Sequence, residues 1–187
     1  NPVEDLNRIG VINQTTMLAS ETQDISDYFR NVMDKKYGAA QLKEHFADTR
    51  DTLCYATNEN QQATLALLNQ PADLSIVVGG YNSSNTSHIV ELCEQKFLTY
   101  FISSESEIIS KTKINHFDFH NQKHITTENF LSENAAFVIR HSSVDIILTS
   151  GASCPDAVVE RVMMKLLSFF EHTKSTDEVM ESVLEMN

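Results

Sequence analysis

Three short polar segments have the residue types needed to bind an anion. They are residues 13–17 (N-Q-T-T-M), 79–88 (G-G-Y-N-S-S-N-T-S-H) and 149–156 (T-S-G-A-S-C-P-D). Each stands where a helix is expected to begin, and a helix start has unpaired backbone N–H groups and the positive end of the helix dipole. Ser, Thr and Asn add neutral donors, and no segment contains Lys or Arg. The pattern predicts a pocket for a polyanion.

The same residues have a simpler explanation, because capping a helix is the commonest role of Ser, Thr and Asn at such positions. For one segment alone, capping is the favoured interpretation. In the last segment Ser153 is expected to cap a helix that has Pro155 in its first turn. Three such segments in one chain favour a shared pocket.

The elements around these segments predict a parallel α/β sheet flanked by helices. Apolar runs predict strands at residues 8–13, 73–79, 98–102 and 145–148, and amphipathic patterns predict helices at 21–37, 58–69, 86–95 and 157–170. Residues 111–131 are polar and are expected to form a hairpin-like excursion. Because ligands bind at the carboxyl ends of parallel strands, the three polar segments are expected on one side of the sheet.

Composition excludes some partners. The net charge of −12, from 14 basic and 26 acidic residues, argues against nucleic acid or an anionic membrane. No apolar run approaches the roughly 20 residues that span a bilayer, and no signal peptide is evident. Three cysteines, an odd number at unpatterned spacing, favour the reducing cytoplasm over a disulfide framework.

The cysteines are expected to have different roles. Cys93 lies on the apolar stripe of its helix and is expected in the core. Cys154 lies beside a capping turn and could be either structural or functional. Cys54 precedes the helix predicted at 58–69, where a lowered thiol pKa would suit a nucleophile or a metal ligand.

Three histidines also suggest a metal site. His116, His120 and His124 would line one face of a helix, but Phe117 and Phe119 alternate with polar residues, which favours an extended, solvated surface segment.

Four segments in order resemble the LytB family, the 4-hydroxy-3-methylbut-2-enyl diphosphate reductases of the methylerythritol phosphate route to isoprenoids. They are the three polar segments and residues 51–57 (D-T-L-C-Y-A-T) with Gln61 four positions on. The resemblance runs from about residue 8 to about residue 167. It implies an enzyme that converts its substrate to isopentenyl and dimethylallyl diphosphate, with electrons from a donor such as ferredoxin or flavodoxin.

The resemblance also implies site residues. Family members hold a 4Fe–4S cluster on three cysteines, and Cys54 matches the last of them. Thr15 and Thr16 match the threonine pair at the substrate pocket. The diphosphate is implied to bind at four further residues, Ser83, Ser84, Asn85 and Ser153.

The chain departs from the family pattern at its start. Two further cluster cysteines, three pocket histidines and a proton-relaying glutamate belong upstream of N-Q-T-T, yet only twelve residues precede Asn13 and none is Cys or His. Many relatives also have Arg beside Gln61, where this chain has Asn60. The expected organisation is one complete domain plus part of a preceding one: residues 1–50 from the middle α/β domain, 51–172 as the carboxyl-terminal α/β domain, and 173–187 as an acidic helical tail.

Three functions remain open. The chain is part of the reductase, inactive alone; or it is a standalone phosphate- or diphosphate-binding module without redox activity; or it is a folded interaction fragment without a ligand. If the chain is part of the reductase, we expect no stoichiometric cluster on this chain alone. We also expect a homo-oligomer formed through residues 8–37, where apolar surface would be left uncovered.

Overall fold

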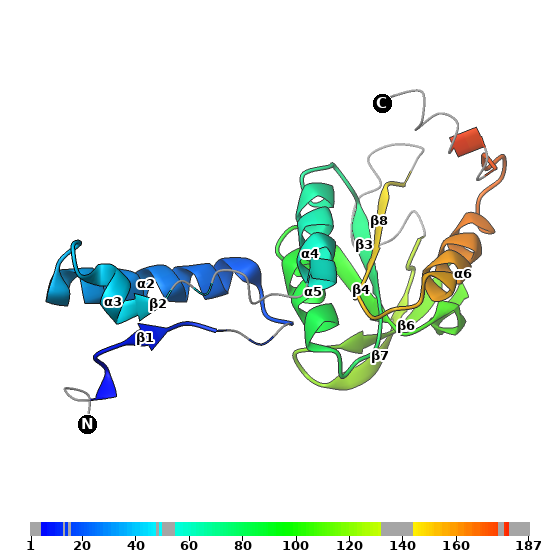
Figure 1. The fold of residues 1–187 in the computed structure, drawn as a ribbon. Coiled ribbons are helices and arrows are strands. Elements are labelled where there is room, and N and C mark those ends of the chain that lie inside the picture. Colours follow the sequence, from blue (N-terminus) through cyan, green and yellow to red (C-terminus); the bar gives the residue numbers. More distant parts are fainter. Residues whose placement is uncertain are drawn as a thin grey trace.

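The computed structural model describes residues 5–12, 14, 16–47, 49, 55–131, 144–175 and 178–179 (Figure 1). In chain order the elements are β1 (Ile9–Gly10), α2 (Ala19–Tyr37), α3 (Leu42–His45), β2 (Phe46–Ala47), α4 (Tyr55–Leu67), β3 (Leu74–Val78), α5 (Ser84–Glu94), β4 (Leu98–Ile102), a short 3-10 turn (Glu105–Glu107), β5 (Ile108–Ser110), β6 (Lys113–Asp118), β7 (Lys123–Glu128), β8 (Ile146–Ser150) and α6 (Asp156–Leu167).

The central sheet has three parallel strands in the order β4-β3-β8. Val78, the last residue of β3, pairs with Ile102 on one side and with Ser150 on the other. The carboxyl ends of all three strands therefore lie along one edge. The predicted α/β class and the predicted parallel pairing of residues 73–79 with 145–148 are confirmed.

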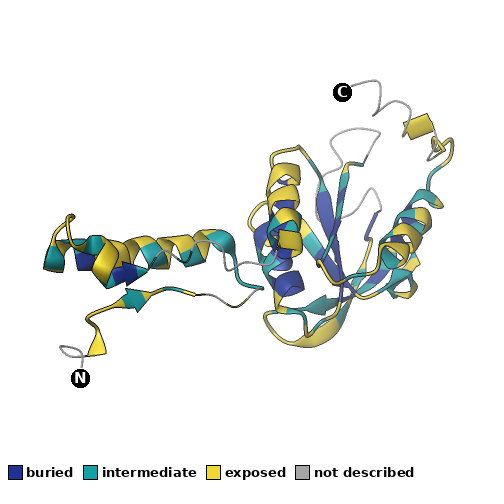
Figure 2. Ribbon diagram, viewed as in Figure 1, coloured by how far each residue is buried: buried dark blue, intermediate teal, exposed yellow. Residues whose placement is uncertain are grey.

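Both faces of the central strand β3 are buried (Figure 2). Along β3, Leu74, Ile76 and Val78 pack toward α6, while Val77 packs toward α5, because side chains alternate along a strand. Cys93 belongs to the cluster on the α5 side and is 0% exposed, as predicted. A strand that is apolar on both faces is typical of a parallel sheet covered by helices.

Residues 108–128 form a separate antiparallel sheet in the order β5-β6-β7. Strands β6 and β7 are a hairpin in which Asp118 pairs with Lys123, so the predicted hairpin-like excursion is confirmed. Its aromatic residues Phe117 and Phe119 pack against the core cluster of α5. The hairpin thereby lies beside the turn between β3 and α5.

The amino-terminal part contains a small parallel pair, β1 with β2, and the long helix α2. The predicted strand at residues 8–13 is shorter in the structure, where only Ile9–Gly10 is paired. Helix α2 ends at Gly38, whose φ of 81° suits glycine and whose N–H bonds to Asp34 O. Its apolar stripe is mostly exposed, as Figure 2 shows, and Met33 is its only buried residue among those described.

Candidate anion-binding site

The turn between β3 and α5 is built around Ser83. The N–H of Ser83 donates to Gly80 O at 3.0 Å and closes a tight turn. The Ser83 hydroxyl then accepts the N–H of Thr86 at 3.3 Å and caps α5. Because a hydroxyl can accept and donate at once, this cap leaves the O–H of Ser83 able to donate to a ligand. Capping and ligand binding are therefore compatible at this residue.

The turn between β8 and α6 lies next to the first. The N–H of Gly151 donates to Val78 O at 3.0 Å, so the two strand ends are joined directly. The prediction that Ser153 caps α6 is wrong. The N-cap is Pro155, without a side-chain hydrogen bond, because a turn closed from Cys154 N to Gly151 O holds Ser153 outside the helix. Ser153 is exposed there.

Thr86 fills the space between the two turns. A Cβ placed on Gly79 or on Gly151 would overlap the Thr86 side chain. Glycine is therefore required at both positions, because the Thr86 side chain approaches the backbone too closely for a Cβ. Neither contact was predicted from the sequence. The signal that could have indicated them is the glycine that directly follows each strand.

Helix α4 contacts all three polar segments, and it reaches the second through Gln61 Nε2, which donates to Asn85 Oδ1 at 3.5 Å. The Asn60 amide donates to Ser150 O at 2.7 Å, and the Gln61 amide donates to Met17 O at 3.2 Å. Thr64 and Thr149 share a hydrogen bond between their hydroxyls at 3.0 Å. The sequence showed Asn60 only as a departure from relatives that have Arg. The structure assigns it a contact with the end of β8.

Three buried donor groups near these turns have no hydrogen-bond partner within the described part of the chain. They are Thr16 Oγ1, Asn85 Nδ2 and Thr86 Oγ1. Asn85 is 3% exposed and Thr86 is 0% exposed. Buried polar groups are nearly always paired, and leaving one unpaired costs about 1–3 kcal/mol. Such groups are expected where a ligand completes the hydrogen bonding.

The predicted site residues are only partly described. Thr15 and Cys54 lie outside the described residues. Ser84 is exposed and lines a hollow of about 400 Å³ together with His88 and Phe119. The neighbours of Ser153, Ala152 and Cys154, line a second hollow of about 360 Å³. The two turns are adjacent at their strand ends but open into different hollows.

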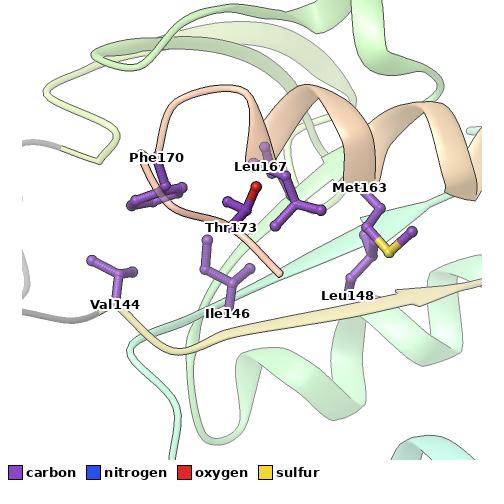
Figure 3. Close-up of a pocket in the computed structure, with 8 residues that line it drawn as sticks. Val144, Ile146, Leu148, Met163, Leu167, Phe170 and Thr173 are labelled. Atoms are coloured by element: carbon purple, nitrogen blue, oxygen red, sulfur yellow. The ribbon is translucent and has the colours of Figure 1, made fainter. Parts of the chain in front are cut away.

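A larger hollow of about 580 Å³ lies beside β8 and α6 (Figure 3). Its lining is apolar apart from Thr173, with residues such as Ile146, Leu148 and Phe170 pointing into it. It has few groups that could hold an anion, so the polar turns remain the candidate site.

Of the other two cysteines, Cys93 is buried and Cys154 is partly buried. Burial raises the pKa of the Cys93 thiol to about 11, and burial, with the nearby Asp156, also raises the pKa of Cys154. A raised thiol pKa disfavours the thiolate that binds iron. Among the described residues, no three His, Cys, Asp or Glu side chains are close enough to share a metal ion.

The three histidines do not converge. His116 is buried, and its pKa is lowered by burial, an effect that Asp118 and Glu107 oppose. It contacts the Thr127 hydroxyl at 2.9 Å, so the prediction of a solvated segment is wrong at His116. His120, beside Glu94, and His124 are largely exposed, as predicted.

Comparison with known proteins identifies close relatives of the sequence. Residues 1–167 match the model of the family described as LytB protein. The chain is 40% identical over 174 residues to the 4-hydroxy-3-methylbut-2-enyl diphosphate reductase of Prochlorococcus marinus (strain NATL1A), covering 92% of this chain and 41% of that protein. For the reductase of Thermosynechococcus vestitus the identity is 42% over 169 residues, covering 90% and 40%.

One solved structure, the E-1-hydroxy-2-methyl-but-2-enyl-4-diphosphate reductase from Plasmodium falciparum, is similar with a TM-score of 0.49 and 18% identity, covering 96% of this chain and 50% of that one. The chain spans about two fifths of the length of the curated relatives it matches. In the described residues, no helix is long and apolar enough to cross a membrane.

Proposed function

Because the chain belongs to the LytB protein family, we propose that it supplies the diphosphate-binding part of a 4-hydroxy-3-methylbut-2-enyl diphosphate reductase. The complete enzyme would convert this substrate to isopentenyl and dimethylallyl diphosphate. This chain would bind and orient the diphosphate through neutral donors. It would act together with the remaining portion of a full-length family member.

The observation that carries this proposal is a set of three buried donors, at Thr16, Asn85 and Thr86, that have no partner among the described residues. All three groups can donate, and an amide N–H₂ can only donate. They call for a ligand with several acceptor oxygens, and diphosphate is such a ligand. Neutral donors also suit a ligand that must be released after reaction, because they bind an anion less tightly than Lys or Arg would.

The proposed substrate residues are Thr15, Thr16, Ser83, Ser84, Asn85 and Ser153. Ser83 contributes a hydroxyl whose acceptor side is already used by α5, so its O–H can donate to the ligand. Ser84 and Ser153 are exposed at the first and second turn, and an exposed hydroxyl can reach a bound diphosphate from outside. Thr16 precedes Met17, whose carbonyl accepts a hydrogen bond from Gln61 of α4. Helix α4 also contacts Ser150, at the end of β8.

An iron–sulfur cluster does not fit the described residues. A 4Fe–4S cluster needs several thiolates, but Cys93 is enclosed in the core and both described thiols have a raised pKa. Cys54 remains the proposed ligand from this chain. The other ligands would come from the rest of the family protein, and so would the contact with a donor such as ferredoxin or flavodoxin. A diphosphate-binding module without redox activity is the alternative function.

In the proposed division at residues 1–50, 51–172 and 173–187, the separate sheets support the first boundary. Within the described residues, β1 and β2 pair with each other alone, whereas β3, β4 and β8 form the central sheet. The first part of the chain extends to one side in Figure 1. A reducing compartment such as the cytoplasm would suit the proposed thiolate ligand at Cys54.

Pyrophosphate titration of the whole chain by calorimetry tests the proposal, with Thr86→Val as the main variant. Valine keeps the shape of threonine but removes the unpaired hydroxyl. The variant should therefore bind pyrophosphate less tightly, while its unliganded form should be at least as stable as wild type.

Thr99→Val is the matched control, because the Thr99 hydroxyl is paired with that of Ser75 near the amino ends of β3 and β4, away from the turns. It should lose stability and keep its affinity. Absence of pyrophosphate binding to the wild-type chain would contradict the proposed function, and so would unchanged affinity in Thr86→Val. Iron content after anaerobic co-expression with the upstream part of a relative distinguishes the reductase from the module without redox activity.

A further inference from the structure

Tyr81 is the largest side chain in the turn that contains Ser83 and leads into Ser84, the first residue of α5. The turn runs from Gly80 to Ser83 and is closed by one backbone hydrogen bond of 3.0 Å. Tyr81 is its second residue and is half-buried. Fixing this side chain therefore restricts the conformation of the whole turn.

The Tyr81 hydroxyl is held by Glu107. It lies 2.5 Å from each carboxylate oxygen. The same carboxylate accepts the Ser103 N–H at 2.5 Å and the Ser103 hydroxyl at 3.1 Å. Hydrogen bonds to an ionised acceptor are stronger than neutral ones. One carboxylate thus joins the turn after β3 to the segment after β4.

The ring of Tyr81 is enclosed by aromatic residues from three strands. It stacks on Phe117 of β6, with centroids 4.6 Å apart, and meets Phe101 of β4 edge-on at 5.0 Å. His124 of β7 meets it edge-on at 5.0 Å. The antiparallel sheet therefore contributes directly to the position of the turn, although none of its residues is proposed to bind the anion.

We infer that Tyr81 and Glu107 are positioning residues, which hold the turn of residues 80–83 in the conformation that presents Ser83, Ser84 and Asn85 to a diphosphate. This inference rests on the proposed function. Neither residue is assigned a contact with the ligand. A carboxylate near an anion site repels the ligand, so Glu107 is placed there for the hydrogen bonds it accepts.

Two substitutions distinguish an effect of the turn's conformation on pyrophosphate binding from an effect of the Glu107 charge. Tyr81→Phe removes the hydroxyl, keeps the ring and leaves the charge unchanged, and it should lower pyrophosphate affinity by about threefold to tenfold, the range expected for one hydrogen bond. Glu107→Ala removes a negative charge near an anion. If charge alone mattered, this variant would bind pyrophosphate more tightly; positioning predicts that it binds less tightly.

The double variant should bind about as weakly as Glu107→Ala alone, because that substitution already removes the contact that Tyr81→Phe breaks. Amide hydrogen exchange of residues 80–86 should quicken in all three variants at temperatures where the chain stays folded. Loss of global stability alone would not reduce the affinity of the folded chain. Thermal unfolding of each variant therefore distinguishes a stability defect from a positioning defect.

Tyr100→Phe is the matched control. Tyr100 is another buried tyrosine of the same domain, but its ring contacts His116 and Phe130 instead of the turn. It should keep wild-type affinity. Wild-type affinity in Tyr81→Phe, or tighter binding in Glu107→Ala, would overturn the inference. A wild-type chain that fails to bind pyrophosphate would instead contradict the proposed function, and the inference with it.

Discussion

Thr86 occupies the space that a side chain at Gly151 would need, so the turns at the ends of β3 and β8 are packed closely against each other. Gly151→Ala should therefore cost about 1–3 kcal/mol in the free energy of unfolding, the usual range for overpacking a filled core. Chemical denaturation measures this cost. Gly80→Ala is the control, because a Cβ at Gly80 meets nothing within 4 Å. Equal stability of the two variants would contradict the contact.

Ser83 and Ser84 are expected to differ, although they are adjacent in the sequence. Ser83→Ala removes the cap of α5 and should cost about 1 kcal/mol of stability, in addition to weakening pyrophosphate binding. Ser84→Ala should weaken binding with little change in stability, because Ser84 is exposed. The double variant should lose about 1–3 kcal/mol of binding free energy if the group is desolvated in the complex. Calorimetry and thermal unfolding of the three variants check both quantities, and unchanged affinity of the double variant would exclude the turn from the site.

Local sequence patterns predicted the parts of the fold that depend on local rules. The apolar runs of β3, β4 and β8 and the Gly-rich stop after β3 are local signals, and the parallel order follows from the helices between the strands. Capping by Ser, Thr or Asn was the simpler explanation of each polar segment, but the sequence did not single out Ser83, which caps α5. The position of Ser153 was not predicted either, because a turn between Gly151 and Cys154 determines it.

The contacts that join the polar segments are between residues far apart in the chain. Asn60 meets Ser150, and Thr64 meets Thr149, across 90 and 85 positions respectively. No local pattern marks these pairs. His116 was misjudged for a similar reason, because its burial comes from packing against Tyr100 of another strand. Tyr81 and Glu107 were likewise unmarked in the sequence.

Tyr81 should make the chain sensitive to alkaline pH. Burial, and next the hydrogen bond to Glu107, raise the pKa of Tyr81 well above its ordinary value near 10. The folded state therefore favours the neutral phenol, and its contribution to stability is fully present below pH 10. It is lost as the pH rises above 10, because the unfolded chain releases this proton while the folded chain keeps it.

Denaturation at several pH values measures this effect. Above pH 10 the free energy of unfolding of the wild type should fall more steeply than that of Tyr81→Phe, by up to about 1.4 kcal/mol per pH unit. Glu107 and His124, which face Tyr81, are present in both chains and should not account for the difference. Parallel pH profiles would show that the Tyr81 proton is not retained.

This chain by itself should not bind a stoichiometric 4Fe–4S cluster. Cys93 is enclosed in the core, and the pKa of Cys154 is raised, so Cys54 would be the main thiolate available. Anaerobic reconstitution with iron and sulfide, followed by iron analysis, checks this expectation. Cys54→Ser should remove most of the iron that does bind, and Cys93→Ser should remove none. About four irons per chain, with turnover of the hydroxymethylbutenyl diphosphate, would refute the expectation.

Helix α2 should mediate self-association of this chain. Its apolar stripe is exposed over Ile25 (43%), Tyr28 (65%), Phe29 (40%) and Val32 (41%). Contiguous apolar surface of this kind generally marks an interface. Sedimentation velocity should detect a dimer or larger species, and Phe29→Lys should shift it toward monomer by placing a charge in the contact. Asn31→Lys adds the same charge at an exposed position off the stripe and should leave the assembly intact. A wild-type monomer at about 100 μM, well above the micromolar affinity of a modest interface, would show that α2 does not pair with a second copy.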